Sequence, residues 1–285
     1  MNQGIPKPAN PRIRPQMENN KIIQYPTILQ AIHLVILYIF IQTVVDFPLA
    51  LIDYFKDTEY LYHPLKKIVL SIGSVVFILW YGFHKTGNRL TDVFPLRKFN
   101  PLLVLGLFFF FLGIQQWLNV INAWVDHVLP PPSWFWELFD KIFENDFGFW
   151  GAFMKVVVVA PIVEELIFRG VIMHGLMRNY SKFTAIFFSG LLFALFHLNP
   201  WQFPATFVLG MILGWIMIRT RNILLCIGGH AINNLLVLLA ITWAQQIKDS
   251  PLASLSVFTV LAVSLVLAGG ALLLMSLVTR EKNLK

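Results

Sequence analysis

Apolar runs long enough to cross a bilayer recur along almost the whole of this sequence, and they decide what it can fold into. A membrane-spanning helix needs about 20 predominantly apolar residues. Eight runs meet or approach that length: residues 28–51, 67–83, 102–125, 149–177, 183–198, 203–218, 223–243 and 252–278. We therefore expect an all-α, polytopic membrane protein with about eight transmembrane helices.

The composition supports a membrane protein and argues against two classes of ligand. The chain is 57% hydrophobic and 13% charged, whereas soluble domains average about 25% charged residues. The net charge of +7 could indicate nucleic-acid binding, but the basic residues lie mainly in loops between apolar runs, which the positive-inside effect explains better. No phosphate-binding glycine loop occurs, so neither nucleic acid nor a nucleotide is an expected partner. The single cysteine, Cys226, excludes an intramolecular disulfide.

Lysine and arginine predict the orientation in the membrane. With the N-terminus inside, fifteen of the 22 basic residues fall in inner segments and five in outer ones, while Lys155 and Arg169 lie within the fourth run. This bias predicts a multi-pass protein of the cell (cytoplasmic) membrane with both termini cytoplasmic. Residues 1–27 are polar and proline-rich and predict a mobile tail, residues 28–278 form the transmembrane domain, and residues 279–285 form a second short tail.

Two adjacent glutamates and an arginine interrupt the fourth apolar run. Each charge at the centre of a membrane helix costs roughly 2.5–3.5 kcal/mol, so Glu164, Glu165 and Arg169 should face the helix bundle. Glu165 and Arg169 are four residues apart and can pair within the helix. Glu164 lies about 100° round the helix and must find its partners elsewhere. Pro161 should kink the helix and free the Val157 carbonyl.

Three further polar residues occur in later runs. His197 ends the fifth run, and His230 and Asn234 lie four apart on one face of the seventh. A membrane histidine taken alone is often a hydrogen-bonded core residue, and a membrane asparagine usually ties helices together. Their conjunction with Glu164 points instead to one shared site.

This group suits two kinds of hydrolytic chemistry. Two imidazoles and a carboxylate are a common ligand set for catalytic zinc, with one position left for water. Alternatively, Glu164 is a general base, and the two histidines and Asn234 hold the water and stabilise an oxyanion. The His-Glu-x-x-His and Gly-x-Ser-x-Gly signatures are absent. The residues leave both mechanisms open.

Three motifs together resemble the CPBP family of intramembrane metalloproteases, which includes the type 2 CAAX-prenyl proteases and the bacteriocin-processing and immunity (Abi) proteins. The motifs fall in order within residues 161–235, and no position departs from the family pattern. They are Glu-Glu-x-x-x-Arg at Glu164, Glu165 and Arg169, Phe-x-x-x-His at Phe193 and His197, and His-x-x-x-Asn at His230 and Asn234. The resemblance implies helices that enclose a polar intramembrane cavity, with a catalytic core over residues 149–245.

The resemblance also implies an activity and a role for each motif residue. The activity is endoproteolysis of a membrane-associated peptide or protein at the lipid bilayer, such as a CAAX protein, a pheromone or a bacteriocin precursor. Glu164 would activate the water, His197 and His230 would hold a metal or that water, and Asn234 would complete the shell. A divalent metal, with zinc expected, would be bound by Glu164, His197 and His230. Glu165 and Arg169 would be a supporting pair, and Phe193 a packing neighbour of His197.

Two other functional classes fit the same residues. A non-catalytic immunity or scaffold protein would keep the fold without cleavage, and a small proton-coupled transporter would also place Glu and His inside the membrane. A change of Glu164 to glutamine separates the three classes, because only the enzyme loses cleavage and only the transporter loses proton-coupled flux.

Three local patterns complete the expectations. Apolar positions at helical spacing over residues 135–143 predict an interfacial helix, with tryptophans at headgroup depth. Gly210 and Gly214 predict close helix packing, and Gly228 and Gly229 leave room for a helix or a substrate. His197 and His230 lie roughly 21 Å and 10 Å along their helices, so one of these helices must begin deeper or tilt.

Overall fold

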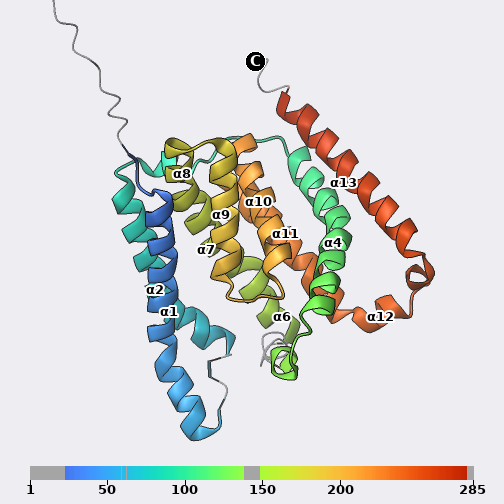
Figure 1. Ribbon diagram of the computed structural model, residues 1–285, viewed down its shortest axis with the longest axis horizontal. Helices are drawn as coiled ribbons and strands as arrows, with labels where there is room; N and C mark the ends of the chain where they lie inside the picture. Colours follow the sequence, from blue (N-terminus) through green and yellow to red (C-terminus); the bar gives the residue numbers. More distant parts are fainter. Residues whose placement is uncertain (1–22, 59, 62, 138–147, 281–285) are drawn as a thin grey trace, which may run out of the picture.

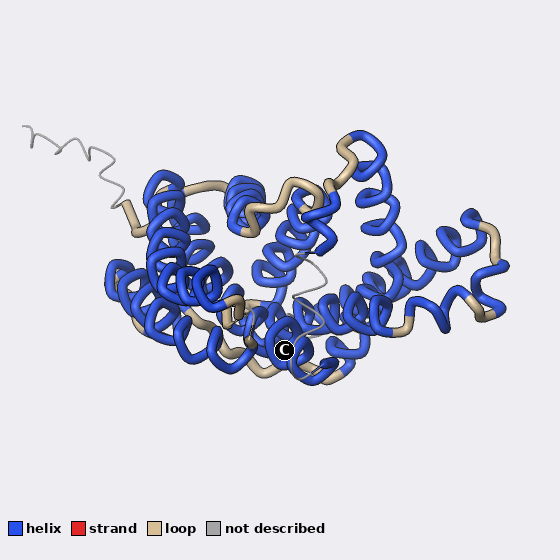
Figure 2. Tube along the Cα trace, turned by 90° about the horizontal axis from the view of Figure 1, so that it is seen from below, coloured by secondary structure: helices blue, strands red, loops and turns tan. Residues whose placement is uncertain are grey.

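A computed structural model describes residues 23–280 except 59, 62 and 138–147. Every regular element in these ranges is a helix (Figures 1 and 2), which confirms the expected all-α fold. Most of the predicted N-terminal tail, residues 138–143 of the predicted interfacial helix, and the end of the C-terminal tail lie outside the described residues. Residues 133–137 are helical.

The eight apolar runs all correspond to helical segments. Among the described residues, six helices are long and apolar enough to cross a membrane: α1 Ile28–Lys56, α2 Pro64–Thr86, α4 Leu102–Val128, α10 Phe203–Thr220, α11 Ile223–Thr242 and α13 Val257–Arg280. The fifth run forms the shorter α9, Lys182–Phe196, and the fourth is interrupted. Short elements not expected from the sequence join them: α3 Leu90–Val93, α12 Ala244–Lys248 and the 3-10 turn Pro251–Ser254.

Two predicted boundaries shift for local reasons. The last helix begins at Val257 instead of residue 252, because the turn at Pro251–Ser254 comes first and the Ser256 hydroxyl then accepts the Thr259 N–H at 3.1 Å. The fifth helix ends at Phe196, because Leu198 takes a positive φ of 51°. His197 is therefore the residue that caps α9 and not part of its last turn.

The fourth run is a helix broken by two π-helical segments. It reads α6 Gly148–Ala152, the π-helix η1 Phe153–Val159, α7 Ala160–Glu165, the π-helix η2 Leu166–Ile172 and α8 Met173–Asn179. Segments of π-helix are rare and often occur at functional sites. The glutamate pair lies at the end of α7, directly between them.

The helices form an extended array with the fourth run near its middle (Figure 1). Helices α1 and α2 lie at one side and α4 and α13 at the other, with α7 and α9–α11 between them. Helix α13 packs along α4, where a Cβ on Gly113 would lie 2.6 Å from the Ser264 carbonyl. The start of α1 and the end of α13 both lie toward the top of the view in Figure 1, at opposite sides of the array.

A close crossing of α9 and α10 supports the centre of the array. A Cβ on Gly210 would lie 2.8 Å from the Cα of Gly190, whereas one on Gly214 would meet Ile186 at 3.6 Å. The crossing therefore depends on Gly210 much more than on Gly214. In α11, Gly229 packs against Phe111 of α4, while Gly228 has nothing within 4 Å of its Cβ position.

Polar side chains join α1 to α2 within their apolar sequences. Gln42 donates to Asp46 at 3.0 Å and to Ser71 at 2.9 Å, and it accepts from Ser74 at 2.8 Å. The bonds to Ser71 and Ser74 cross between the helices, and all three satisfy groups that lipid cannot satisfy. Elsewhere the outer helices carry large exposed apolar side chains, such as Phe40, Trp80, Val266 and Leu273, as expected of surfaces that face lipid.

Candidate active site

Glu164 and the two motif histidines meet although they come from three different segments. Oε2 of Glu164, near the end of α7, lies 3.9 Å from Nε2 of His197 and 4.0 Å from Nε2 of His230. His197 caps α9 and His230 lies in the second turn of α11. The expected difference in depth is therefore absorbed by the placement of the two helices, and both histidines reach one carboxylate oxygen.

The other nitrogen of each imidazole is held by an acceptor. Nδ1 of His197 lies 2.8 Å from the Phe193 carbonyl, and Nδ1 of His230 lies 3.0 Å from Oε1 of Glu165. A carbonyl or an ionised carboxylate only accepts, so in a neutral imidazole the proton is on Nδ1. Each Nε2 then carries a free lone pair that faces Glu164.

Three acceptors consequently surround one small space. They are the lone pairs of the two Nε2 atoms and Oε2 of Glu164, which is buried and has no hydrogen-bond partner. Acceptors cannot satisfy one another, and an unpaired buried carboxylate oxygen is costly. The arrangement suits a group that donates hydrogen bonds or carries positive charge, such as a water molecule or a cation.

The donor set can be compared with what a metal needs. Two neutral imidazoles with oriented Nδ1–H groups and one carboxylate are ligand types that zinc accepts. In the described part of the chain, however, no three such side chains already converge at metal-binding distances. The chemistry of the ligands fits a divalent metal, and the metal itself stays a prediction.

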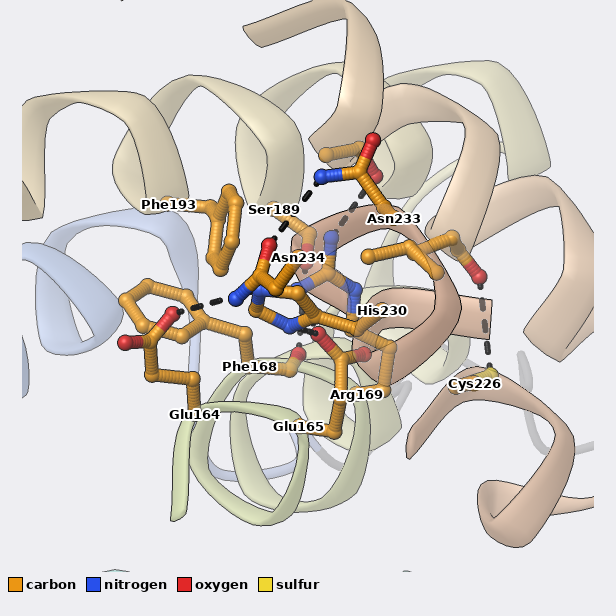
Figure 3. A network of polar contacts seen from close by, with 12 residues as sticks. Glu164, Glu165, Phe168, Arg169, Ser189, Phe193, Cys226, His230, Asn233 and Asn234 are labelled. Atoms are coloured by element: carbon orange, nitrogen blue, oxygen red, sulfur yellow. Dashed lines mark hydrogen bonds and ion pairs between the residues drawn. The ribbon is translucent and has the colours of Figure 1, made fainter. Parts of the chain in front are cut away.

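Glu165 contacts both His230 and Arg169, as Figure 3 shows. Its Oε1 accepts from Nη1 of Arg169 at 2.9 Å as well as from His230. Arg169 also donates from Nη2 to the Gly210 carbonyl at 2.9 Å, and its guanidinium lies 4.5 Å from the centre of the Phe193 ring. Glu165 and Arg169 are both fully buried. Through these contacts the pair predicted within one helix connects that helix to α10 and α11.

Phe193 lies at the junction of these groups. Its ring centre is 5.0 Å from that of His197 and 5.5 Å from that of His230, in edge-on arrangements. With Arg169 over its ring, Phe193 touches both imidazoles and the supporting cation. It therefore fixes the spacing between the two histidines by packing.

Asn234 joins α11 to the π-helical segment η1. Its Nδ2 donates to the Val156 carbonyl at 2.9 Å, and its Oδ1 accepts from Asn233 at 3.0 Å. The predicted free carbonyl was Val157, which is wrong by one residue. In η1 the N–H of Ala160 bonds to Lys155, five residues back, so the carbonyl left without a partner by Pro161 is that of Val156.

The site is closed on one side and accessible on the other. The side chains of His230 and Glu165 are 3% and 0% exposed, whereas those of Glu164 and His197 are 14% and 26% exposed. Glu164 is therefore accessible from the side of His197. The loop beyond it carries Trp201, whose ring packs at 4.5 Å against Phe135 and whose N–H donates to the Leu129 carbonyl.

Helix α1 brings one residue to the site that the motifs do not reveal. Tyr38 is 7% exposed and its phenol interacts electrostatically with Glu164. The buried positions Ala31, Leu34, Val35 and Tyr38 share one face of α1. That helical spacing was visible in the sequence, but nothing in it indicated which helix α1 would face.

Comparison with known proteins gives one result, which concerns this part of the chain. Residues 146–236 match the family model described as type II CAAX prenyl endopeptidase, Rce1-like. The resemblance to the CAAX proteases is confirmed. The Rce1-like segment contains the broken fourth helix, α9, α10 and most of α11, and hence all seven motif residues. Its family name indicates a protease. No curated protein and no solved structure matches the chain.

Proposed function

We propose that this protein is an intramembrane endopeptidase that hydrolyses a peptide bond in a membrane-associated peptide or protein, of the CAAX or bacteriocin and pheromone kind. The observation that carries the proposal is the convergence of three acceptors, Oε2 of Glu164 and Nε2 of both histidines, on one space. The described part of the chain has six helices that are long and apolar enough to cross a bilayer. We place the protein in the cytoplasmic membrane, with both termini cytoplasmic.

The first step uses Glu164 as general base. A water between Glu164 and the two imidazoles gives a proton to Oε2 of Glu164 while its oxygen attacks the scissile carbonyl carbon. The C–O π electrons move onto the carbonyl oxygen, which becomes an oxyanion. Asn234 keeps one amide hydrogen beyond the one bonded to Val156 and can donate it to this oxyanion.

The second step returns the proton. The oxyanion re-forms the carbonyl, the carbon–nitrogen bond breaks, and the proton on Glu164 passes to the leaving amine. Products are a carboxylic acid and an amine, and Glu164 is again ionised. His230 keeps its orientation throughout, because Glu165 holds its Nδ1–H.

Glu164, His197 and His230 would also be the ligands of a divalent metal, for which zinc suits the donor set. When bound, such an ion acidifies its water and polarises the substrate carbonyl. The roles of Glu165, Phe193 and Asn234 in holding the histidines and the helix are the same in either case.

Cleavage of a membrane-tethered peptide by detergent-purified variants tests the proposal. Glu164→Gln keeps the size of the side chain and removes the base, so the rate should fall by about 10²–10⁴-fold. Its melting temperature should equal or exceed that of the parent, because a buried carboxylate is expensive. Glu137→Gln is the matched control, since Glu137 is exposed and remote in sequence from the motifs. Near-parental cleavage by folded Glu164→Gln would end the protease assignment and favour the scaffold.

Metal content is measured separately from activity. Elemental analysis of the parent, His197→Ala and His230→Ala should give about one divalent ion per parent chain and a marked loss in both variants. Equal metal content in all three proteins would remove the metal site and leave Glu164 as a base without it.

A further inference from the structure

The proposed reaction needs more hydrogen-bond donors than the three motifs supply. The groups nearest the expected water are Glu164 and two Nε2 lone pairs, all of them acceptors. The oxyanion that forms on the carbonyl oxygen requires donors aimed at it, and sites of this kind usually provide two. Among the motif residues only Asn234 has an amide hydrogen to offer.

Tyr38 is held rigidly beside this site by aromatic packing. Its ring stacks on Phe196 with centres 5.1 Å apart and an interplanar angle of 11°. Phe196 directly precedes His197 and also packs on Phe168 at 5.6 Å, one residue before Arg169. The phenol therefore comes from α1, outside the Rce1-like segment, yet its ring packs on the residue next to His197.

The hydroxyl of Tyr38 is unused. It makes no hydrogen bond within the described part of the chain. Its oxygen is nevertheless not fully enclosed by the protein, so part of its surface remains accessible. Of the charged groups, Glu164 acts on it most strongly, followed by Asp46. A buried tyrosine hydroxyl normally has a partner. A hydroxyl that lacks one, close to a catalytic carboxylate, is suited to donate to a bound substrate.

We propose that Tyr38 is a catalytic residue whose phenol O–H donates a hydrogen bond to the oxyanion, as the second donor beside Asn234. The phenol keeps its proton, so the transfers between water, Glu164 and the leaving amine are unchanged. This assignment rests on the proposed peptidase function and adds to it a residue from a different helix.

Kinetics of Tyr38→Phe test the assignment, because phenylalanine keeps the ring stack on Phe196 and removes only the hydroxyl. We expect kcat to fall by about 10²–10³-fold, as for other single oxyanion donors, with KM and melting temperature close to those of the parent. Tyr81→Phe is the matched control: Tyr81 lies on α2, where it stacks on Phe77 and lies beneath Lys85. It should cleave at the parental rate.

A pair of ligands separates catalysis from structure. A peptide phosphinate mimics the tetrahedral oxyanion, whereas a non-cleavable peptide isostere mimics the bound substrate. Tyr38→Phe should bind the phosphinate more weakly by about the factor lost in kcat/KM and bind the isostere as the parent does. A loss of equal size for both ligands would mean that Tyr38 only shapes the pocket, and it would overturn the assignment.

The outcomes distinguish a failure of the Tyr38 assignment from a failure of the proposed peptidase function. If the parent cleaves, Glu164→Gln does not, and Tyr38→Phe stays within about twofold of the parent, the role of Tyr38 is wrong and the peptidase stands. If the parent cleaves no membrane-tethered peptide, both assignments are wrong.

Discussion

Nδ1 of His230 lies 3.0 Å from Oε1 of Glu165, the same oxygen that accepts a hydrogen bond from Arg169 at 2.9 Å. One buried carboxylate oxygen thus orients an imidazole and neutralises a guanidinium. The two adjacent glutamates differ in their other oxygen: Oε2 lacks a hydrogen-bond partner in both residues, but Oε1 of Glu165 accepts two hydrogen bonds inside the protein. Glu165 therefore supports the structure, whereas Glu164 is available for the proposed chemistry.

Removing the Glu165 charge should damage both fold and catalysis, and a second change should separate the two effects. Glu165→Gln leaves Arg169 buried without a counter-charge, which costs about 3–5 kcal/mol. Glu165→Gln combined with Arg169→Gln should melt at a higher temperature than either single variant. Its cleavage rate should nevertheless stay about 10–100-fold below the parent, because His230 loses its orienting carboxylate. A double variant no more stable than the worse single one would contradict the pairing.

The bond from Asn234 to the Val156 carbonyl should be coupled to Pro161. Asn234→Leu leaves that half-buried carbonyl unpaired, which costs up to about 1–3 kcal/mol. Pro161→Ala supplies the N–H that the π-helical register directs at Val156, so in that background Asn234→Leu should cost less. Melting curves of the four proteins give the coupling directly. Additive effects would show that Pro161 and Asn234 are independent.

The glycines of α10 and α11 provide matched pairs for stability. Gly210→Ala should destabilise by about 1–3 kcal/mol, because its Cβ would meet the α9 backbone at 2.8 Å, and it should move the carbonyl that Arg169 uses. Gly214→Ala meets only ordinary contacts at 3.6 Å and should be tolerated. Gly228→Ala, with open space around it, should gain up to about 1 kcal/mol from helix propensity. Equal melting temperatures for Gly210→Ala and Gly214→Ala would refute the close crossing.

Membrane orientation can be tested by cysteine labelling in intact cells. After replacement of the buried Cys226, a single cysteine at Lys98 should resist a membrane-impermeant thiol reagent, and one at Lys248 should react. The reason is the basic bias of the loops near Lys98. The reverse labelling pattern would place the termini outside.

The lengths of the apolar runs were enough to predict the helices, because a run of about 20 apolar residues has few ways to satisfy its backbone in lipid. It also identified the motif residues, since charges inside such runs are too costly to be incidental. It was less successful at helix ends and within the fourth run. There the π-helical register moved the free carbonyl from Val157 to Val156, an outcome of backbone hydrogen bonding that side-chain spacing does not encode.

Which groups face one another depends on how the helices pack. Helical periodicity shows that Glu165 can reach Arg169, but not that His230 would share the same oxygen, nor that the Gly210 carbonyl would complete the arginine's contacts. Tyr38 illustrates the limit most clearly: its place on the buried face of α1 could be read from spacing, whereas its nearness to Glu164 depends on how α1 packs against α9. Contacts between distant segments are set by packing, and packing depends on all the helices at once.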